Sequence, residues 1–175
     1  VLPNNAFNVI GIGHHPSRGM RRGMVVNIEE TIQTIQYAIK EAELRAGFNV
    51  RSVCTGIAGS HIHSFNSSGM VAVKDVEITQ SDIDRVLDTA RAVSIPADQQ
   101  ILHVLPQEYK VNDQDGIRTP IGMTGMRLEV KVHIITGSVS AAQNIVKCIR
   151  RCGLEVSDLR LQPLASAATT LTQDE

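Results

Sequence analysis

Two pairs of potential metal ligands have spacings that place both side chains on one face of an element. His61 and His63 are two residues apart in a predicted strand, so their imidazoles would share a face and could bind zinc. Cys148 and Cys152 are four residues apart in a predicted helix, which would supply half of a metal site. No third ligand is near the histidines in sequence, and Cys152 continues an apolar stripe. We therefore favour surface histidines and packed cysteines.

Two other groups of polar residues could support catalysis, but each has a simpler interpretation. Ser17 closely follows His14 and could be a nucleophile beside a base, yet no acidic residue stands at a spacing that would orient that base. Glu108 with Asp113 or Asp115 could form an acid–base pair. Acidic residues that flank a surface loop need no such role, however.

A Gly-x-Gly motif follows an apolar stretch near the start of the chain. Gly11 and Gly13 resemble the first glycines of a dinucleotide-binding loop, but Pro16 occupies the position of the third glycine and no helix begins there. The phosphate-binding interpretation therefore fails. The residues predict no catalytic, cofactor-binding or metal site, and we expect that this chain is not an enzyme.

The composition argues against several classes of partner. The chain has 175 residues, 42% of them apolar, with 17 basic and 18 acidic side chains. This balance argues against nucleic-acid binding, and the cluster of Arg18, Arg21 and Arg22 fits a solvated loop. No apolar run approaches the ~20 residues of a membrane span, and the N-terminus lacks signal-peptide features. Three cysteines without framework spacing favour a reducing, cytoplasmic compartment.

The clearest positioning element lies between Gly125 and Gly137. Apolar side chains alternate there with charged or polar ones for nine residues, which predicts a half-buried strand of an antiparallel sheet. The apolar set is Met126, Leu128, Val130, Val132 and Ile134.

The N-terminal flank has the pattern of a layered α/β fold. We predict a strand at residues 7–13, a helix that Asn27 caps and Gly47 ends, and a strand at residues 52–57. Strand, helix and strand in this order imply a parallel sheet with helices on its faces.

The middle of the chain has a different pattern. It predicts a strand or hairpin kinked at Gly69, then a helix that Thr79 and Asp82 cap as a box. A strand broken or edged at Pro106 follows, because proline cannot donate to a central ladder. A long loop at residues 112–125 leads into the alternating strand. The order is therefore strand, helix, strand, strand.

The first pattern then resumes, with a helix ended by Gly153, a strand at residues 154–161 and a last helix. The predicted fold class is therefore α/β with an α+β insertion. We place the insertion at residues 60–133 and the discontinuous host domain at residues 1–59 and 134–175.

Short motifs occur in order along nearly the whole chain. They include Pro16-Ser17-Arg18-Gly19-Met20, Gly59-Ser60-His61-Ile62, Val104-Leu105-Pro106-Gln107-Glu108-Tyr109, Pro120-Ile121-Gly122-Met123, Asn144-Ile145-Val146-Lys147 and Arg151-Cys152-Gly153-Leu154. Each motif is weak alone, but together they are specific, and the block from Pro106 to Gly125 is the strongest part. With these motifs the chain resembles the family of the bacterial cell division protein FtsA.

The resemblance implies a partial actin-like (ribonuclease H-like) domain, similar to actin and the Hsp70 ATPases, with an inserted strand-helix-strand-strand (SHS2) subdomain. Members of this family bind ATP and magnesium between two large domains, with weak or no hydrolysis, and polymerise. They link FtsZ to the cytoplasmic face of the membrane at the division site through a C-terminal amphipathic helix. They contact later division proteins through the insertion. We expect subunit or partner contacts near Met70, Ala72 and Asp98, which we place together at the tip of the insertion. The alternative, which applies above all to Met70, is that these residues only complete a small core.

Relative to the family pattern, the chain lacks both phosphate loops, the adenosine-binding half, the FtsZ-binding portion and the membrane helix. The resemblance therefore identifies it as a fragment. We expect no ATP binding by this fragment, because a nucleotide needs backbone amides and metal-binding carboxylates from both lobes. A hairpin that should precede Phe7 is also lacking. We expect the strand at residues 7–13 to expose an edge through which the fragment dimerises or swaps.

Two alternative functions are weighed against this interpretation. The first is a sugar kinase or Hsp70-like ATPase of the same superfamily, against which the strand-helix-strand-strand insertion argues. The second is the pilus-assembly relative of FtsA, which shares the insertion. The Gly- and Met-rich loop before Met126 favours the division protein.

Overall fold

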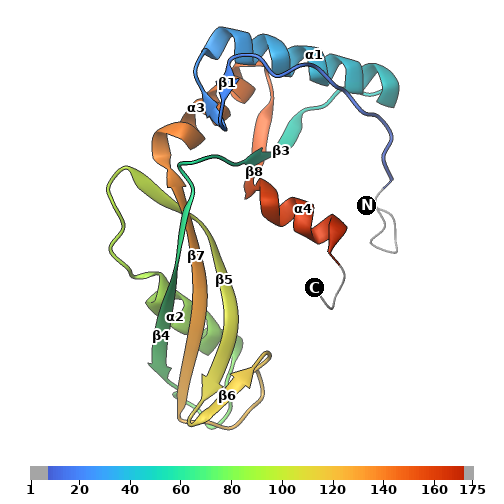
Figure 1. Cartoon of the computed structure of the whole chain (residues 1–175). Coiled ribbons are helices and arrows are strands. Elements are labelled where there is room, and N and C mark those ends of the chain that lie inside the picture. Colours follow the sequence, from blue (N-terminus) through green and yellow to red (C-terminus); the bar gives the residue numbers. More distant parts are fainter. Residues whose placement is uncertain (1–7, 172–175) are drawn as a thin grey trace. The chain divides into compact units, whose positions relative to one another are not determined.

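The computed structural model describes residues 8–171 and divides the chain into two compact units (Figure 1). The host unit comprises Val1–His61 with Val139–Glu175, and the inserted unit is Ile62–Ser138. The inserted unit ends beyond the predicted boundary at residue 133, because its last strand runs without interruption to Ser138.

The inserted unit is built on a four-stranded antiparallel sheet. Its strands are β4 (His63–Ala72), β5 (Gln99–Val111), β6 (Gln114–Ile117) and β7 (Arg127–Ser138), in the spatial order β4-β7-β5-β6. Figure 1 shows β4, β7 and β5 as long neighbouring strands. Helix α2 (Gln80–Arg91) packs on one face of this sheet, against β4 and β7.

The core of the inserted unit lies between β7 and α2. Leu128 and Ile134 of β7 are 0% exposed, and Val86 and Ala90 of α2 are equally buried. Burying one such aliphatic side chain contributes roughly 1.5–3 kcal/mol. The charged residues that alternate with the apolar ones lie on the opposite, outer face. The prediction of a half-buried antiparallel strand is therefore confirmed from Arg127 onward. Met126, which was predicted as part of the apolar face, precedes β7 and is 82% exposed.

The predicted kink at Gly69 is wrong. β4 pairs with β7 without a register shift, and Gly69 lies opposite Val130. A Cβ at position 69 would stand 2.4 Å from the Val86 carbonyl oxygen and 2.7 Å from the Ala90 backbone nitrogen. The glycine is needed because the helix backbone passes directly over the strand.

The predicted capping box of α2 is confirmed. The Asp82 carboxylate accepts from the Thr79 backbone N–H at 2.9 Å and from the Thr79 hydroxyl at 2.7 Å. The Thr79 side chain in turn accepts from the backbone at position 82. The Arg85 guanidinium donates to the same carboxylate at 2.5 Å.

Strand β5 is continuous through Pro106, which pairs with Val132 of β7, but the register shifts immediately after it. On its other side β5 pairs with β6 only around Tyr109 and Val111. Pro106 therefore lies where β5 has no second neighbour, so the prediction that proline marks an edge is confirmed.

The segment predicted as a loop at residues 112–125 contains strand β6. The chain turns at Asn112, which has a φ of 53°, and pairs Val111 with Gln114. Asn112 tolerates the left-handed conformation because its short polar side chain can bond locally. Its side-chain oxygen accepts from the backbone N–H groups of Met126 and Arg127.

The host unit contains the parallel strands β3 (Ser52–Ile57) and β8 (Glu155–Leu161) and the helices α1 (Ile28–Ala46), α3 (Val139–Arg151) and α4 (Gln162–Thr170). Parallel pairing in this unit was predicted, but β3 pairs with β8 and not with residues 8–13. A separate short hairpin consists of β1 (Met20–Arg21) and β2 (Met24–Val25). The predicted caps of α1 are confirmed, because Asn27 accepts from the Glu30 N–H at 3.2 Å and Gly47 is left-handed.

The predicted strand at residues 7–13 is wrong for residues 8–13, and Phe7 lies outside the described residues. The segment instead lies against α1. A Cβ at Gly11 would stand 2.6 Å from the Ala42 carbonyl oxygen, and one at Gly13 would stand 1.8 Å from that of Ala38. The edge that was to mediate dimerisation or swapping is therefore not formed by residues 8–13.

Candidate functional site

The outer face of the inserted sheet, on the side away from α2, gathers side chains from all four strands. Directly opposed residues of an antiparallel pair project to the same face. Met70 lies opposite Glu129 and Ala72 lies opposite Arg127, so these four side chains share the outer face. Met70 is 56% exposed and offers an apolar surface beside charged neighbours.

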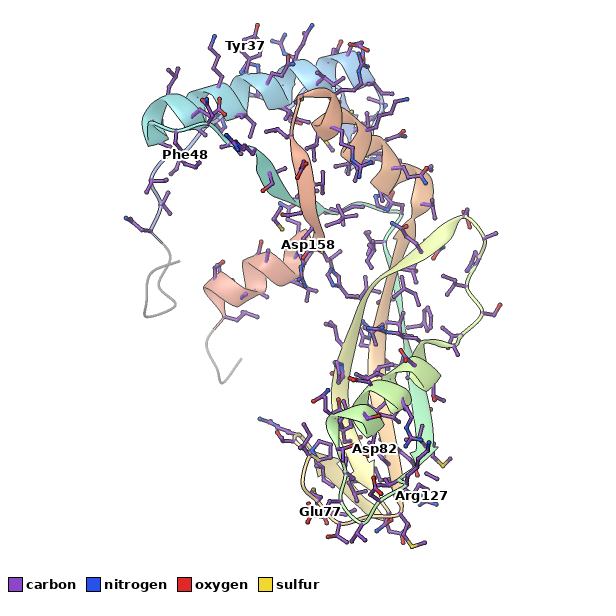
Figure 2. All side chains as sticks on the ribbon, turned by 180° about the vertical axis from the view of Figure 1, so that it is seen from behind. Tyr37, Phe48, Glu77, Asp82, Arg127 and Asp158 are labelled. Carbon is purple, nitrogen blue, oxygen red and sulfur yellow. The ribbon has the colours of Figure 1, made fainter. Side chains whose placement is uncertain are left out.

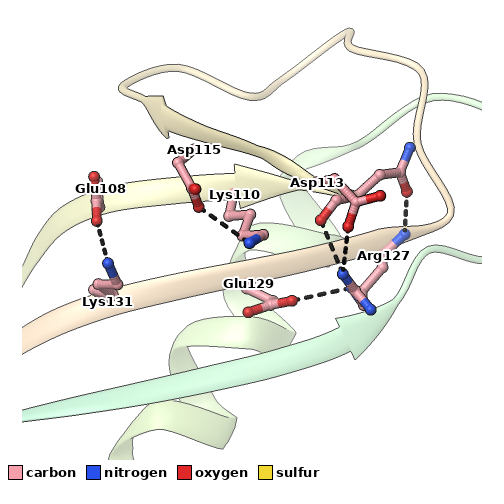
Figure 3. Close-up of polar contacts among 8 residues, drawn as sticks. Glu108, Lys110, Asp113, Asp115, Arg127, Glu129 and Lys131 are labelled. Carbon is pink, nitrogen blue, oxygen red and sulfur yellow. Dashed lines mark hydrogen bonds and ion pairs between the residues drawn. The ribbon is translucent and has the colours of Figure 1, made fainter.

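Ion pairs cover the part of this face that β5, β6 and β7 form (Figure 3). Each acidic residue considered above as a possible catalytic group is bonded to a cation, so none is paired with another acid. The pairs are Glu108–Lys131 at 2.5 Å, Asp115–Lys110 at 3.3 Å, Asp113–Arg127 at 3.3 Å and Glu129–Arg127 at 3.0 Å. The hydrogen bond that the Lys131 ammonium donates to the Glu108 carboxylate raises the pKa of Lys131. These contacts balance charge on an exposed surface and arrange no acid–base chemistry.

A polar hollow of about 440 Å³ lies between β4 and β5 on the inserted unit. Asn66, Ser68, Gln107 and Lys131 contribute to its lining. The Asn66 side-chain oxygen lies 2.7 Å from Nδ1 of His133, which joins β4 to β7 across the outer face. The hollow offers amide, hydroxyl and ammonium groups, which suit contact with polar groups of another protein.

The three residues predicted as contact positions do not come together. Ala72 ends β4 opposite Arg127, at the start of β7. Asp98 is exposed and directly precedes Gln99, which pairs with Ser138 at the other end of β7. At about 3.3 Å per residue, the two ends are roughly 35 Å apart. Placing all three at one tip was wrong, because β4 and β5 are both antiparallel to β7.

The histidine pair does not have the predicted geometry. His61 lies in a turn before β4, and its two buried ring nitrogens have no partner among the described residues. His63 is the first residue of β4 and is exposed. Within residues 8–171, no group of three or more histidine, cysteine or acidic side chains is arranged to hold a metal ion.

The cysteine pair packs α3 against α1, as predicted. Cys148 is 0% exposed, and its Sγ lies 4.0 Å from the Ile28 carbonyl oxygen. The Cys152 Sγ lies 3.6 Å from the Ile32 carbonyl oxygen of α1. Burial raises the pKa of both thiols, so they stay neutral and serve as small apolar groups.

The region of Ser17 contains no nucleophile–base arrangement in the described structure. The backbone N–H of His14 donates to the Glu41 carboxylate at 2.8 Å and lowers its pKa. The His15 ring stacks on Tyr37 with centroids 4.8 Å apart. Both histidines therefore help to seat the segment before α1 on that helix.

The sequence did not indicate that β4 is an edge strand of the sheet, nor that a polar hollow lies beside Ser68. The only indication of this surface in the sequence was the alternation in β7, which predicts that its charged residues face solvent. Assigning strand neighbours to that surface required the register between β4, β7 and β5.

The fold and this surface together define an α/β protein that carries an SHS2 domain. Residues 59–136 match the family model described as the SHS2 domain inserted in FtsA. The fold also resembles a chain of a solved PilM-PilN type IV pilus biogenesis complex, with a TM-score of 0.55 and 18% identity. That match covers 88% of this chain and 40% of the other. The predicted α/β fold class with its insertion is therefore confirmed.

Over its whole length the chain is similar to cell division proteins named FtsA. Over its full length it is 56% identical to FtsA of Pseudomonas aeruginosa, 52% identical to that of Neisseria meningitidis serogroup B and 43% identical to that of Escherichia coli K12. It spans 42% of the length of each of these relatives. Among the helices of the described part, none combines the length and the apolar character needed to cross a membrane.

Proposed function

We propose that the inserted unit is a protein-binding module of an FtsA-like division protein. The complete protein polymerises on bound ATP and magnesium, links FtsZ to the cytoplasmic face of the membrane through a helix outside this chain, and recruits later division proteins. The match of residues 59–136 to the SHS2 domain inserted in FtsA carries the proposal. The balanced, ion-paired outer face supports a surface for contact rather than for catalysis.

We assign the contacts of this module to two places on the sheet. Met70 and Ala72 lie at the end of β4, where an exposed apolar side chain stands beside the pairs made by Arg127. Asp98 marks a second place at the start of β5. Since the two places are at opposite ends of β7, one module can contact two different proteins or subunits.

A charge-reversal series in the complete gene tests the assignment. Met70→Glu, Ala72→Glu and Asp98→Lys are introduced in cells depleted of their own copy, and cell length reports division. Self-association and binding to division proteins are measured in parallel by two-hybrid assay. We expect the β4 substitutions to reduce one interaction at least fivefold and Asp98→Lys to reduce a different one.

Lys147→Glu is the matched control, because this exposed residue of α3 belongs to the host unit, whereas the assigned positions belong to the inserted unit. It should leave division and both interactions unchanged. Normal division, self-association and partner binding in all three test variants would refute the proposed role of this surface.

A further inference from the structure

One edge of the inserted sheet presents unpaired backbone groups. β4 is the end strand of the sheet. Directly after β4, the Val73 N–H donates at 2.9 Å to the carbonyl of Met126, which directly precedes β7, and this bond continues the β4–β7 ladder. Along an antiparallel strand, the backbone N–H and C=O groups of successive residues point alternately to one neighbour and to the other. The backbone groups of the odd-numbered residues of β4 therefore point towards β7. The Arg85 guanidinium donates to the Ala72 carbonyl at 2.8 Å from the open side, which agrees with this alternation.

Even-numbered positions of β4 thus direct both N–H and C=O groups away from the sheet. Within residues 8–171, no bond to these backbone groups is made at four successive even positions. These positions are Ser64, Asn66, Ser68 and Met70. All four residues are exposed. Arg85 closes the row at Ala72, so the free part of the edge accommodates about six residues of an extended chain.

The two sides of the sheet differ in how they are protected against pairing. The β5 side carries Pro106, a register shift and the short strand β6, with charged residues such as Lys110 and Asp115. These features normally prevent one sheet edge from adding another strand. β4 has ten residues, and from Ser64 to Ala72 it contains neither proline nor a charged side chain.

We propose that the β4 edge binds an extended segment of another protein, which joins the sheet as a fifth strand. The proposal rests on the proposed role of the inserted unit as a binding module and specifies how that unit recognises one partner. Main-chain hydrogen bonds supply the affinity, and side-chain pairs across the new ladder supply selectivity. The bound segment carries a hydroxyl residue opposite Ser68 and an apolar residue opposite Met70.

The position of α2 argues against a second copy of this chain as the occupant. α2 passes directly over β4, since a Cβ at Gly69 would stand 2.4 Å from the Val86 carbonyl oxygen. Two paired β4 edges would be about 4.8 Å apart. Two α2 helices on the same face of the joined sheet would then crowd each other, because packed helix axes need about 8–10 Å. A segment without its own helix on that face fits.

A peptide selection on the 175-residue chain tests strand addition. The probe is a phage-displayed library of random seven-residue peptides, and the enriched peptides are synthesised for affinity measurements. Ser68→Pro removes an N–H that the β4–β7 ladder does not use, so the fold should persist, as circular dichroism can check. We expect this variant and Met70→Lys to bind the peptides at least tenfold more weakly, and Lys147→Glu to bind them normally.

Hydrogen exchange supplies the decisive readout. On peptide binding, the amides of Asn66, Ser68 and Met70 should become protected, while the odd-numbered amides of β4 change little because β7 already protects them. No enrichment of peptides, equal binding by both edge variants, or protection elsewhere would each overturn the proposal. If Ser68→Pro does not fold, the peptide affinity of Met70→Lys alone is the test of weakened binding.

The two proposals fail separately. Protected even-numbered amides with unaffected division in the variants would retain strand addition and remove the role in division. Impaired division in the variants with unprotected β4 amides would retain the binding module and remove strand addition.

Discussion

Gly69 of β4 lies directly beneath the Val86 carbonyl of α2, so close that a Cβ at position 69 would stand 2.4 Å from that oxygen. Both partners in this contact are backbone, so neither can move aside as a flexible side chain would. We expect Gly69→Ala to destabilise the inserted unit by about 1–3 kcal/mol through overpacking. Urea unfolding followed by circular dichroism measures this change.

Gly56→Ala is the matched control for that substitution. Gly56 also lies in a strand, but a Cβ there would meet Gln162 at 3.5 Å, which is an ordinary contact. The free energy of unfolding of the Gly56→Ala variant should differ from that of the parent chain by no more than about 0.5 kcal/mol. Equal effects of the two substitutions would contradict the account of the α2–β4 contact.

The Thr79–Asp82 capping box should stabilise the N-terminus of α2 (Figure 2 labels Asp82 on this helix). Thr79→Ala should destabilise the inserted unit by about 1 kcal/mol, because it removes one side of the reciprocal cap. Thermal unfolding at neutral pH measures this loss. Ser81→Ala on the same helix is exposed and should have little effect.

Low pH should remove part of the stability that the Thr79–Asp82 capping box contributes. The Thr79 backbone N–H, then its hydroxyl, and then Arg85 lower the pKa of Asp82 in the folded chain. A lowered folded-state pKa gives stability that is present above the unfolded value of about 3.9 and is lost as pH falls through the folded value. Asp82→Asn should therefore be less stable at pH 7 and show a smaller loss below about pH 4 than the parent chain. An equal loss of stability in both proteins as the pH falls would contradict this.

Thiol reactivity should separate the three cysteines. Cys54 is exposed, whereas burial raises the pKa of Cys148 and Cys152. At pH 8 a disulfide reagent should modify one thiol rapidly and the other two only as the host unit opens. Cys54→Ser should abolish the fast phase, and urea should restore two reactive thiols. Three fast thiols in the native parent chain would show that α3 does not pack on α1 as described.

Nucleotide binding is expected to need more of the protein than this chain. The chain spans 42% of the length of its FtsA relatives. We propose that the complete protein holds ATP with backbone amides and carboxylates from two lobes. Calorimetric titration of the chain with Mg-ATP should give no tight binding, while a complete relative serves as the positive control. Micromolar or tighter binding by the chain alone would contradict this expectation.

Local patterns in the sequence were sufficient for the elements with short-range causes. The alternation around Val130 predicted β7, and the residues at Asn27, Thr79 and Asp82 predicted two helix starts, because periodicity and caps depend on neighbours within a few positions. Pro106 likewise marked an edge, since a missing N–H has the same consequence in any strand.

Tertiary structure alone decided which elements meet. Residues 8–13 have a strand-like pattern but lie on α1, because Gly11 and Gly13 permit close approach to that helix. β3 found its parallel neighbour in β8, about one hundred residues away, and Met70 and Asp98 fell at opposite ends of one sheet. Pairing over such distances depends on the packing of the whole core, which no local spacing encodes.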